Sequence, residues 1–328
     1  MLNYSVAELR IMLFDKKIIE LKSLIYKTLS PYLSSKCAFL ELPYYPNVGD
    51  LLIWEGTEKF IEDHGMECVY KASRWSYKYR RLDKNITILL QGGGNFGDIW
   101  RPCQDFRLKV IRDYMDNPII ILPQSVFYED EKVLEQDVEE MGRHKNLIIC
   151  ARDIGSYEIL KKHFTKNRIL LLPDMAFCID LSTITKYALE SFRDILVVQR
   201  EDKESKYFDF STIKFSSEKV DFRDWPCMEK RLIQTEIGFK LIGVHRRIGD
   251  FMDFAMDLYF QNFYKANLIK SGVRFVSSYK EIYTTRLHVA ILCVLLSKPF
   301  VFIDNTYSKN LNFYKTWLHD LDNVNFIS

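Results

Sequence analysis

The sequence predicts an α/β fold with two Rossmann-like domains, each a doubly wound parallel sheet, that face each other across a cleft. Short apolar runs alternate with stretches of helical periodicity, which is typical of parallel sheets covered on both faces. The 328 residues are enough for about two domains of roughly 150 residues each. The polar and charged residues that could carry chemistry follow the apolar runs, where ligands bind in such sheets.

Residues 1–36 are expected to form an amphipathic helix ahead of the two domains. Apolar residues recur at helical spacing over 5–33, and residues 1–36 carry six basic and three acidic side chains, a net charge of +3. Two interpretations stay open: a packed helix with a solvated lysine face, the commoner case, or peripheral contact with the inner face of the plasma membrane. We expect an N-terminal domain over 37–185 and a C-terminal domain over 186–328, with the last helix packing back on the first domain.

Strands and helices are expected to alternate along both domains. In the first domain a helix over 51–65 ends at Gly65, a common stop signal, and the strands are 37–43, 85–94, 118–125, 146–153 and 168–174. In the second domain the helices are 248–272 and 284–296, and the strands are 195–202, 240–246, 273–278 and 298–304. The stretch 202–235 is charged and irregular, and no element is assigned to it.

The composition excludes several classes of protein. With 48% hydrophobic and 27% charged residues, the chain is too apolar to be disordered, and its net charge of +2 lacks the basic excess of a dedicated nucleic-acid binder. No apolar run reaches the roughly 18 residues of a membrane span, and the first residues lack the form of a signal peptide. The seven cysteines are scattered and odd in number, so neither a disulfide framework nor a zinc site is expected. We expect a cytoplasmic protein.

Two polar segments follow strands of the first domain. PNVGD (46–50) offers Asn47 and Asp50 at a helix start, although such a segment alone is more often an ordinary capping turn. QGGGNFGD (91–98) removes side chains from a strand tip, so that backbone amides can bind an anion or a substrate. It matches neither the dinucleotide fingerprint nor the P-loop. The segment's candidate residues are Gly92, Gly93, Gly94, Asn95 and Asp98, the last as a base or a partner of a sugar hydroxyl.

Charged residues follow other runs. Arg152 ends the run 146–153, where its guanidinium can bind a phosphate or carboxylate or can equally pair with Asp153 or another acid. Asp174 and Arg200 likewise lie near the ends of the apolar runs 168–174 and 195–202. Arg286 and His288 begin the apolar helix 284–296, and this pairing makes His288 an acid/base candidate although a histidine beside an apolar run is usually a core residue.

Lys309 follows the run 298–304. Cations that converge from separate strand ends suit a small dianion or trianion. The six histidines include no pair at metal-ligand spacing, so no metal site is expected.

Together the motifs resemble those of the polysaccharide pyruvyl transferase family. In order they are PNVGD, LLQGGGNFGD, ILPQS, CARDIGSYEIL, LLPDMAF, VVQRED and TTRLHVAILCVLLSKPFVFID, followed by Tyr307 and Lys309, over about residues 44–315. The resemblance implies a GT-B-like fold. It implies transfer of the enolpyruvyl unit of phosphoenolpyruvate (PEP) onto two hydroxyls of a sugar, which forms a pyruvate ketal and releases phosphate. The implied acceptor is a glycan of a capsule or exopolysaccharide, or its polyprenyl-diphosphate-linked precursor.

The resemblance assigns PEP binding and catalysis to Arg152, His288 and Lys309. The acceptor side falls on the glycine-rich loop and the N-x-G-D motif, here Asn47, Asp50, Gly92, Gly93, Gly94 and Asn95. Arg152, Arg286 and Lys309 can neutralise the two ends of PEP, and His288 is the best donor of a proton to its methylene carbon. Asp50 or Asp98 is expected to accept the sugar proton. PEP is expected as donor substrate, with no cofactor, metal or nucleic acid.

Two other classes of function stay open. One is a nucleotide-sugar glycosyltransferase of the same architecture, although no nucleotide fingerprint occurs in the chain. The other is a non-catalytic glycan- or anion-binding protein on the same scaffold, which would have no need to keep Arg152, His288 and Lys309 together.

Overall fold

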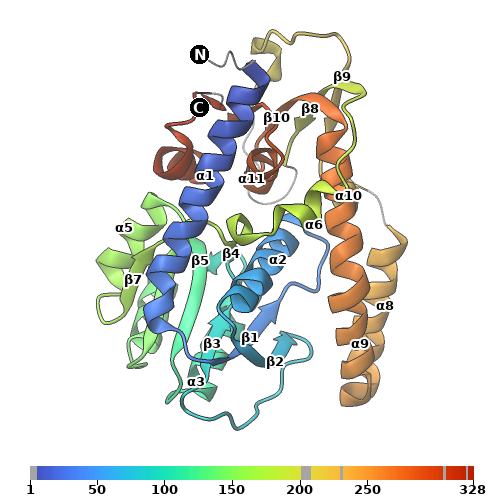
Figure 1. Ribbon diagram of the computed structural model, residues 1–328. Helices are drawn as coiled ribbons and strands as arrows, with labels where there is room; N and C mark the ends of the chain where they lie inside the picture. Colours follow the sequence, from blue (N-terminus) through green and yellow to red (C-terminus); the bar gives the residue numbers. More distant parts are fainter. Residues whose placement is uncertain (1–5, 201–207, 230–231, 306–307, 323) are drawn as a thin grey trace.

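Two parallel β-sheets form the frame of the molecule, and the computed structural model describes residues 6–200, 208–229, 232–305, 308–322 and 324–328 (Figure 1). In these residues the first sheet has seven strands, with β2-β1-β3-β5-β6-β7 hydrogen-bonded in that order and β4 beside β5. The second sheet has five, in the order β12-β11-β10-β8-β9, and every described pair is parallel. Both orders run outward in two directions from an inner strand, so the prediction of two doubly wound sheets is confirmed.

The first sheet is covered on both faces because its strands are apolar on both sides. Ile119 and Ile121 of β5 face one hydrophobic cluster, and Ile120 and Leu122 face the other. Helices α3, α4 and α5 cover the first face, and α2 covers the second. The strands are β1 (Lys36–Leu42), β2 (Glu67–Ser73), β3 (Thr87–Leu90), β4 (Gly93–Gly97), β5 (Ile119–Phe127), β6 (Leu147–Ala151) and β7 (Arg168–Leu171). The helices are α2 (Val48–Asp63), α3 (Arg101–Asp113), α4 (Glu131–Met141), α5 (Ile154–His163) and the short α6 (Leu181–Thr185).

The second sheet is smaller, and a long helical hairpin extends from it (Figure 1). Its strands are β8 (Arg193–Val198), β9 (Val220–Arg223), β10 (Tyr279–Thr284), β11 (Phe300–Ile303) and β12 (Val324–Ile327). Its helices are α7 (Pro226–Glu229), α8 (Ile233–Ile248), α9 (Asp253–Tyr259), α10 (Lys265–Ser277), α11 (Leu287–Leu295) and α12 (Lys309–Phe313). A π-helical turn over Phe260–Tyr264 joins α9 to α10, and another over Tyr314–Leu318 follows α12.

Several predicted elements need correction. The runs 240–246 and 273–278 were expected to be strands, but they belong to helices α8 and α10. Both runs are short and apolar, and periodicity alone does not separate a buried strand from a helix at that length. The expected strand 85–94 is two strands, because β3 ends at Leu90 and Gly93 begins β4. Within 202–235, which had no assignment, the structure contains β9 and α7, and residues 201–207 and 230–231 lie outside the described residues.

The N-terminal helix α1 (Val6–Leu29) is packed into the fold and contacts α11 (Figure 1). Two of its lysines pair with the rest of the protein, Lys17 with Asp320 at 2.6 Å and Lys22 with Asp63 at 3.2 Å. Its buried apolar side chains recur at helical spacing and are Phe14, Ile18, Leu21, Ile25 and Leu29. No described helix is both long and apolar enough to cross a bilayer. Membrane contact through residues 1–36 stays a prediction.

The C-terminal segment touches the first sheet's helices. Thr316 accepts a hydrogen bond from the Ile154 amide at 3.1 Å, at the start of α5. The indole of Trp317 donates to the Arg152 carbonyl at 2.7 Å. The domain boundary near 185 stays a prediction.

A glycine in α2 allows this helix to pack closely on the turn that follows β7. A Cβ atom at Gly56 would lie 2.0 Å from the carbonyl oxygen of Met175, which belongs to the 3₁₀ turn Met175–Cys178. We therefore expect Gly56→Ala to lower the free energy of unfolding by about 1–3 kcal/mol, because the backbone must move apart. The matched control is Gly243→Ala in α8, where a Cβ would meet no atom within 4 Å. This substitution should raise the free energy of unfolding by about 0.5–1 kcal/mol, because alanine is the better helix former. Urea denaturation of both variants measures this, and equal effects would contradict the packing argument.

Candidate functional site

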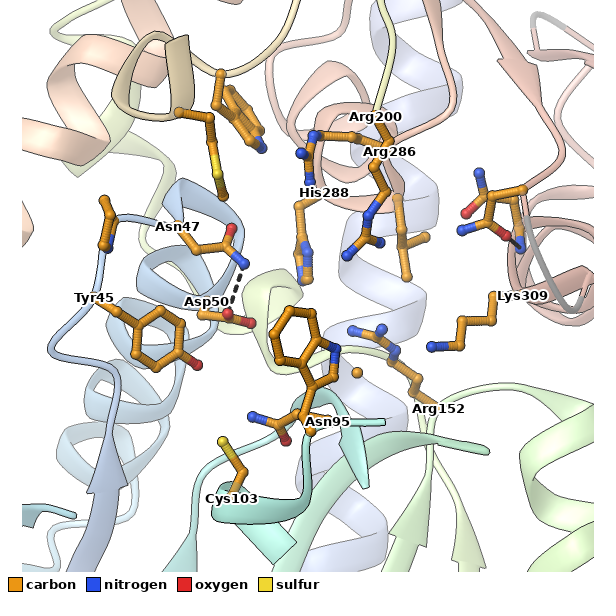
Figure 2. Close-up of a pocket in the computed structure, with 18 of the residues that line it drawn as sticks. Tyr45, Asn47, Asp50, Asn95, Cys103, Arg152, Arg200, Arg286, His288 and Lys309 are labelled. Atoms are coloured by element: carbon orange, nitrogen blue, oxygen red, sulfur yellow. Dashed lines mark hydrogen bonds between the residues drawn. The ribbon is translucent and has the colours of Figure 1, made fainter. Parts of the chain in front are cut away.

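A cavity of about 530 Å³ lies at the carboxyl ends of the strands of both sheets (Figure 2). The segments after β1 and β6 of the first sheet and after β8, β10 and β11 of the second all supply lining residues. Ligands bind at this edge in doubly wound sheets. The lining residues predicted from the sequence are Asn47, Asp50, Gly94, Asn95, Arg152, Arg286, His288 and Lys309.

A buried carboxylate joins the two halves of the cavity. Asp174 has no exposed surface, and its Oδ2 accepts a hydrogen bond from Arg152 Nη1 at 2.9 Å and lies 3.3 Å from His288 Nε2. Its other oxygen accepts from the Ala176 amide. Burial alone would raise the pKa of Asp174, but His288 and Arg152 outweigh it and lower that pKa to about 2. Asp174 is therefore ionised and holds the arginine and the histidine side by side.

Arg152 is oriented by contacts on several sides. Its Nε donates to Ser125 Oγ at 2.9 Å, and that hydroxyl donates to Asp153 at 2.6 Å. A Cβ atom at Gly94 would lie 2.8 Å from Arg152 Nη2, so the glycine makes room for the guanidinium. Asp153, which the sequence offered as an ion-pair partner, instead caps α5 through the Ser156 amide. The arginine thus reaches the cavity in one fixed orientation.

His288 lies against the start of α2. A Cβ atom at Gly49 would be 2.4 Å from His288 Nδ1, so only glycine leaves room for the ring. With Nε2 beside Asp174 and Nδ1 beside Gly49, the imidazole is positioned from both sides. The close approach that Gly49 permits in the PNVGD segment is therefore that of this histidine.

Asp50 is the carboxylate among the described residues that line the cavity (Figure 2). Asn47 caps α2 by accepting from the Gly49 amide at 3.0 Å, and its amide group donates to Asp50 Oδ2 at 2.7 Å. Asn47 therefore caps the helix, as the common interpretation of PNVGD expects, and also orients Asp50. Burial raises the pKa of Asp50, and the positive charges of His288 and Arg152 lower it only in part. A raised pKa makes this carboxylate a better base than an exposed aspartate.

The carboxylate of Asp224 fixes the orientation of Arg286. Its Nε and Nη2 donate to the two carboxylate oxygens of Asp224, and both residues are buried. Lys309 is buried at the start of α12, and Arg200 comes from the end of β8. The side chains of Arg286, Arg200 and Lys309 line the second sheet's side of the cavity (Figure 2).

The structure separates the members of the glycine-rich loop. Gly94 and Asn95 line the cavity, and Arg107 holds Asn95 by bonding its carbonyl oxygen and its side-chain oxygen. Gly92 and Gly93 are not among the described residues that line it. Asp98 also lies away from the cavity lining, because its Oδ2 accepts hydrogen bonds from the Glu129 and Asp130 amides, each at 2.7 Å. Asp98 therefore stabilises a turn in the structure, and of the two predicted bases only Asp50 lines the cavity.

Sequence reasoning missed some residues that shape the site. Asp174 was noted only as a charge after a run, and its pairing with Arg152 and His288 has no local signal. Asp224 lies in the stretch that had no assignment, and Arg74, Tyr45 and Trp100 line the cavity without forming a motif. In the part of the chain that the structure describes, no three histidine, cysteine, aspartate or glutamate side chains cluster in a way that could hold a metal ion.

A cavity lined by arginines, a lysine, Asp50 and His288, between two doubly wound parallel sheets, is typical of the GT-B-like class of α/β proteins. The family model for polysaccharide pyruvyl transferases matches residues 47–307, and the chain belongs to that family. It is accordingly a transferase, and the family implies a polysaccharide acceptor.

Known proteins agree with this assignment. "Putative pyruvyl transferase EpsO" of Bacillus subtilis is 32% identical over 306 residues, 89% of this chain and 88% of that protein. "Pyruvyl transferase 1" of Schizosaccharomyces pombe is 28% identical over 89% of this chain and 72% of that protein. A crystal structure of an uncharacterised protein from Klebsiella pneumoniae has a TM-score of 0.63 at 20% identity, covering 94% of this chain and 98% of that one, which shows a shared fold.

The charge on Asp174 should stabilise the protein above the acid range. Since its pKa is lowered to about 2, its contribution is complete above the ordinary aspartate value of about 3.9 and disappears as the pH falls through about 2. We expect Asp174→Asn to lower the free energy of unfolding at pH 7 by about 2–3 kcal/mol, and the deficit to shrink below pH ~4. Asp130→Asn is the control, because Asp130 also caps a helix and asparagine caps equally well. Urea denaturation across this pH range measures the difference, and a deficit independent of pH would contradict the charge argument.

Proposed function

We propose that this enzyme transfers the enolpyruvyl unit of PEP onto two hydroxyls of one sugar in a cell-surface polysaccharide or its lipid-linked precursor. The product is a cyclic pyruvate ketal, phosphate is released, and the reaction takes place in the cytoplasm. The observation that carries the proposal is the convergence of Arg152 and His288 on the buried Asp174, in a cavity that Lys309 and Arg286 also line.

The cationic side chains suit the charges of PEP. PEP carries a carboxylate and a phosphate on one carbon, and arginine forks bind both groups through paired hydrogen bonds. Arg152 on the first sheet's side faces Lys309 and Arg286 on the second sheet's side. Because these side chains are buried, their hydrogen bonds to an anion are stronger than they would be in water.

His288 is proposed as the acid. Its imidazolium gives a proton to the methylene carbon of PEP. The electrons of the double bond form the new C–H bond, which leaves an oxocarbenium-like centre at the carbon that bears the carboxylate. The negative charge of Asp174 stabilises the protonated ring before transfer, and the contacts with Gly49 and Asp174 orient it.

Asp50 is proposed as the base. The first sugar hydroxyl adds to the cationic carbon and loses its proton to Asp50, which the Asn47 amide orients. The bond to phosphate then breaks, and the second hydroxyl adds to the regenerated cation. Of the two hydroxyl protons, one balances the proton given to the methylene carbon and the other leaves with phosphate.

Substitutions at His288 and Arg152 should have different kinetic signatures. His288→Gln should retain PEP binding and lower turnover by about 10²–10⁴, because only the proton donor is removed. Arg152→Ala should raise the KM for PEP and lower kcat together, because an anion contact and the partner of Asp174 are both lost. His319→Gln, at an exposed position, is the control. Phosphate release from PEP with a glycan panel, beside UDP release from UDP-sugars, measures these effects. UDP release without phosphate release would reject the proposed reaction.

The base assignment predicts a specific pH dependence. Because burial raises the pKa of Asp50, the acid limb of kcat/KM should lie above the ordinary aspartate value of about 3.9, with activity rising as the pH rises through it. Asp50→Asn should remove most activity together with that limb. Asp98→Asn should leave the profile in place, since Asp98 binds backbone amides away from the cavity lining. If Asp98→Asn abolished the limb instead, Asp50 would not be the base.

A further inference from the structure

The hairpin of α8 and α9 exposes an unusual amount of apolar surface at the edge of the molecule (Figure 1). Phe251 and Phe254, at the turn of the hairpin, are 88% and 78% exposed. We name six of the exposed apolar side chains of α8, α9 and the turn between them the hairpin surface. They are Ile237, Val244, Ile248, Phe251, Phe254 and Leu258. Ile233 and Phe239 of α8 are exposed as well. Large exposed apolar side chains that gather on one helical hairpin are typical of an interaction site.

Helix α8 is apolar on two sides, and only one side is covered by the fold. Its buried residues, including Gly238 and Ile242, face the neighbouring helix, where a Cβ at Gly238 would lie 2.9 Å from the ring of Phe260. Ile237, Val244 and Ile248 recur at helical spacing on the exposed side. The packing of the hairpin therefore does not account for the hairpin surface.

Among the hairpin residues whose side chains the structure describes, the exposed charges are mainly basic. Lys240, Arg246 and Arg247 are exposed, and Glu236 is the exposed acid of α8. Two acids of α9 point toward the protein instead. Asp253 pairs with His245 and Lys78, and Asp257 accepts hydrogen bonds from Tyr44 at 2.8 Å and from Ser76 at 2.9 Å.

A groove connects the hairpin with the cavity. It is lined by Arg74, Pro102, Lys109 and Arg246, among others, and Arg74 and Pro102 also line the cavity. The groove therefore adjoins the cavity and reaches Arg246 on the hairpin, and its charged lining side chains are three basic ones and the acidic Asp105.

We propose that the hairpin surface docks on an anionic lipid bilayer, with Phe251 and Phe254 inserted among the lipids and the basic side chains over the headgroups. Aromatic and aliphatic side chains flanked by lysine and arginine have this chemistry. The groove then leads from the bilayer to the cavity, so the acceptor is anchored in the same membrane, a conclusion that rests on the proposed function. A second copy of the chain fits less well, because a twofold axis beside the turn of the hairpin would bring Arg246 and Arg247 of both copies together.

Vesicle co-sedimentation tests this docking. The full-length protein should sediment with phosphatidylcholine–phosphatidylglycerol vesicles at low salt, and less with phosphatidylcholine alone. Phe251→Ser/Phe254→Ser should weaken the partition about tenfold or more, and Arg246→Glu/Arg247→Glu should remove its dependence on phosphatidylglycerol. Phe192→Ser, at a position 67% exposed outside the hairpin, is the control and should bind like the unsubstituted protein. Thermal melts confirm that each variant is folded.

Three results would overturn the docking surface. The first is that the unsubstituted protein does not sediment with anionic vesicles. The second is that the paired Phe variant binds as well as the Phe192→Ser control. The third is that Lys16→Glu/Lys27→Glu in α1 is enough to abolish binding. Analytical ultracentrifugation adds a fourth, a dimer that Phe251→Ser/Phe254→Ser dissociates. Phosphate release with a soluble glycan acceptor should survive in the paired Phe variant. Loss of vesicle binding with this activity intact separates the docking surface from the proposed reaction.

Discussion

The buried carboxylate of Asp174 is the constraint on which the rest of the site depends. An ionised group without solvent is tolerated only when partners compensate its charge, and here Arg152 and His288 share one of its oxygens. The arginine follows a strand of the first sheet, and the histidine begins a helix of the second. One negative charge therefore sets how the first sheet's side and the second sheet's side of the cavity stand relative to each other.

Much of the fold could be predicted because buried parallel strands are continuous apolar runs. The runs at 118–125 and 146–153 are β5 and β6 of the structure. The strands that were missed, β2, β9 and β12, lie at sheet edges and are only partly buried, so their sequences lack a continuous apolar run. Apolar runs inside α8 and α10 were mistaken for strands because those helices also bury residues along part of their length.

The sequence predicts which side chains lie at the strand ends that form the site, but not which of those side chains pair with each other. That rule found Asp50, Arg152 and His288, all of which line the cavity. It could not decide between Asp153 and Asp174 as the partner of Arg152, because that choice depends on how β6 and the segment after β7 meet in space. Asp98 shows the same difficulty, since amides 31 and 32 residues away bind its carboxylate.

The contact between Gly49 and His288 also limits how the enzyme can move. The ring occupies the space in which any side chain at position 49 would stand, so the two halves of the molecule already touch at this point. Steric repulsion opposes approach but not separation. This contact therefore acts as a mechanical stop: a relative motion of the two halves can separate them at this point but cannot bring them closer.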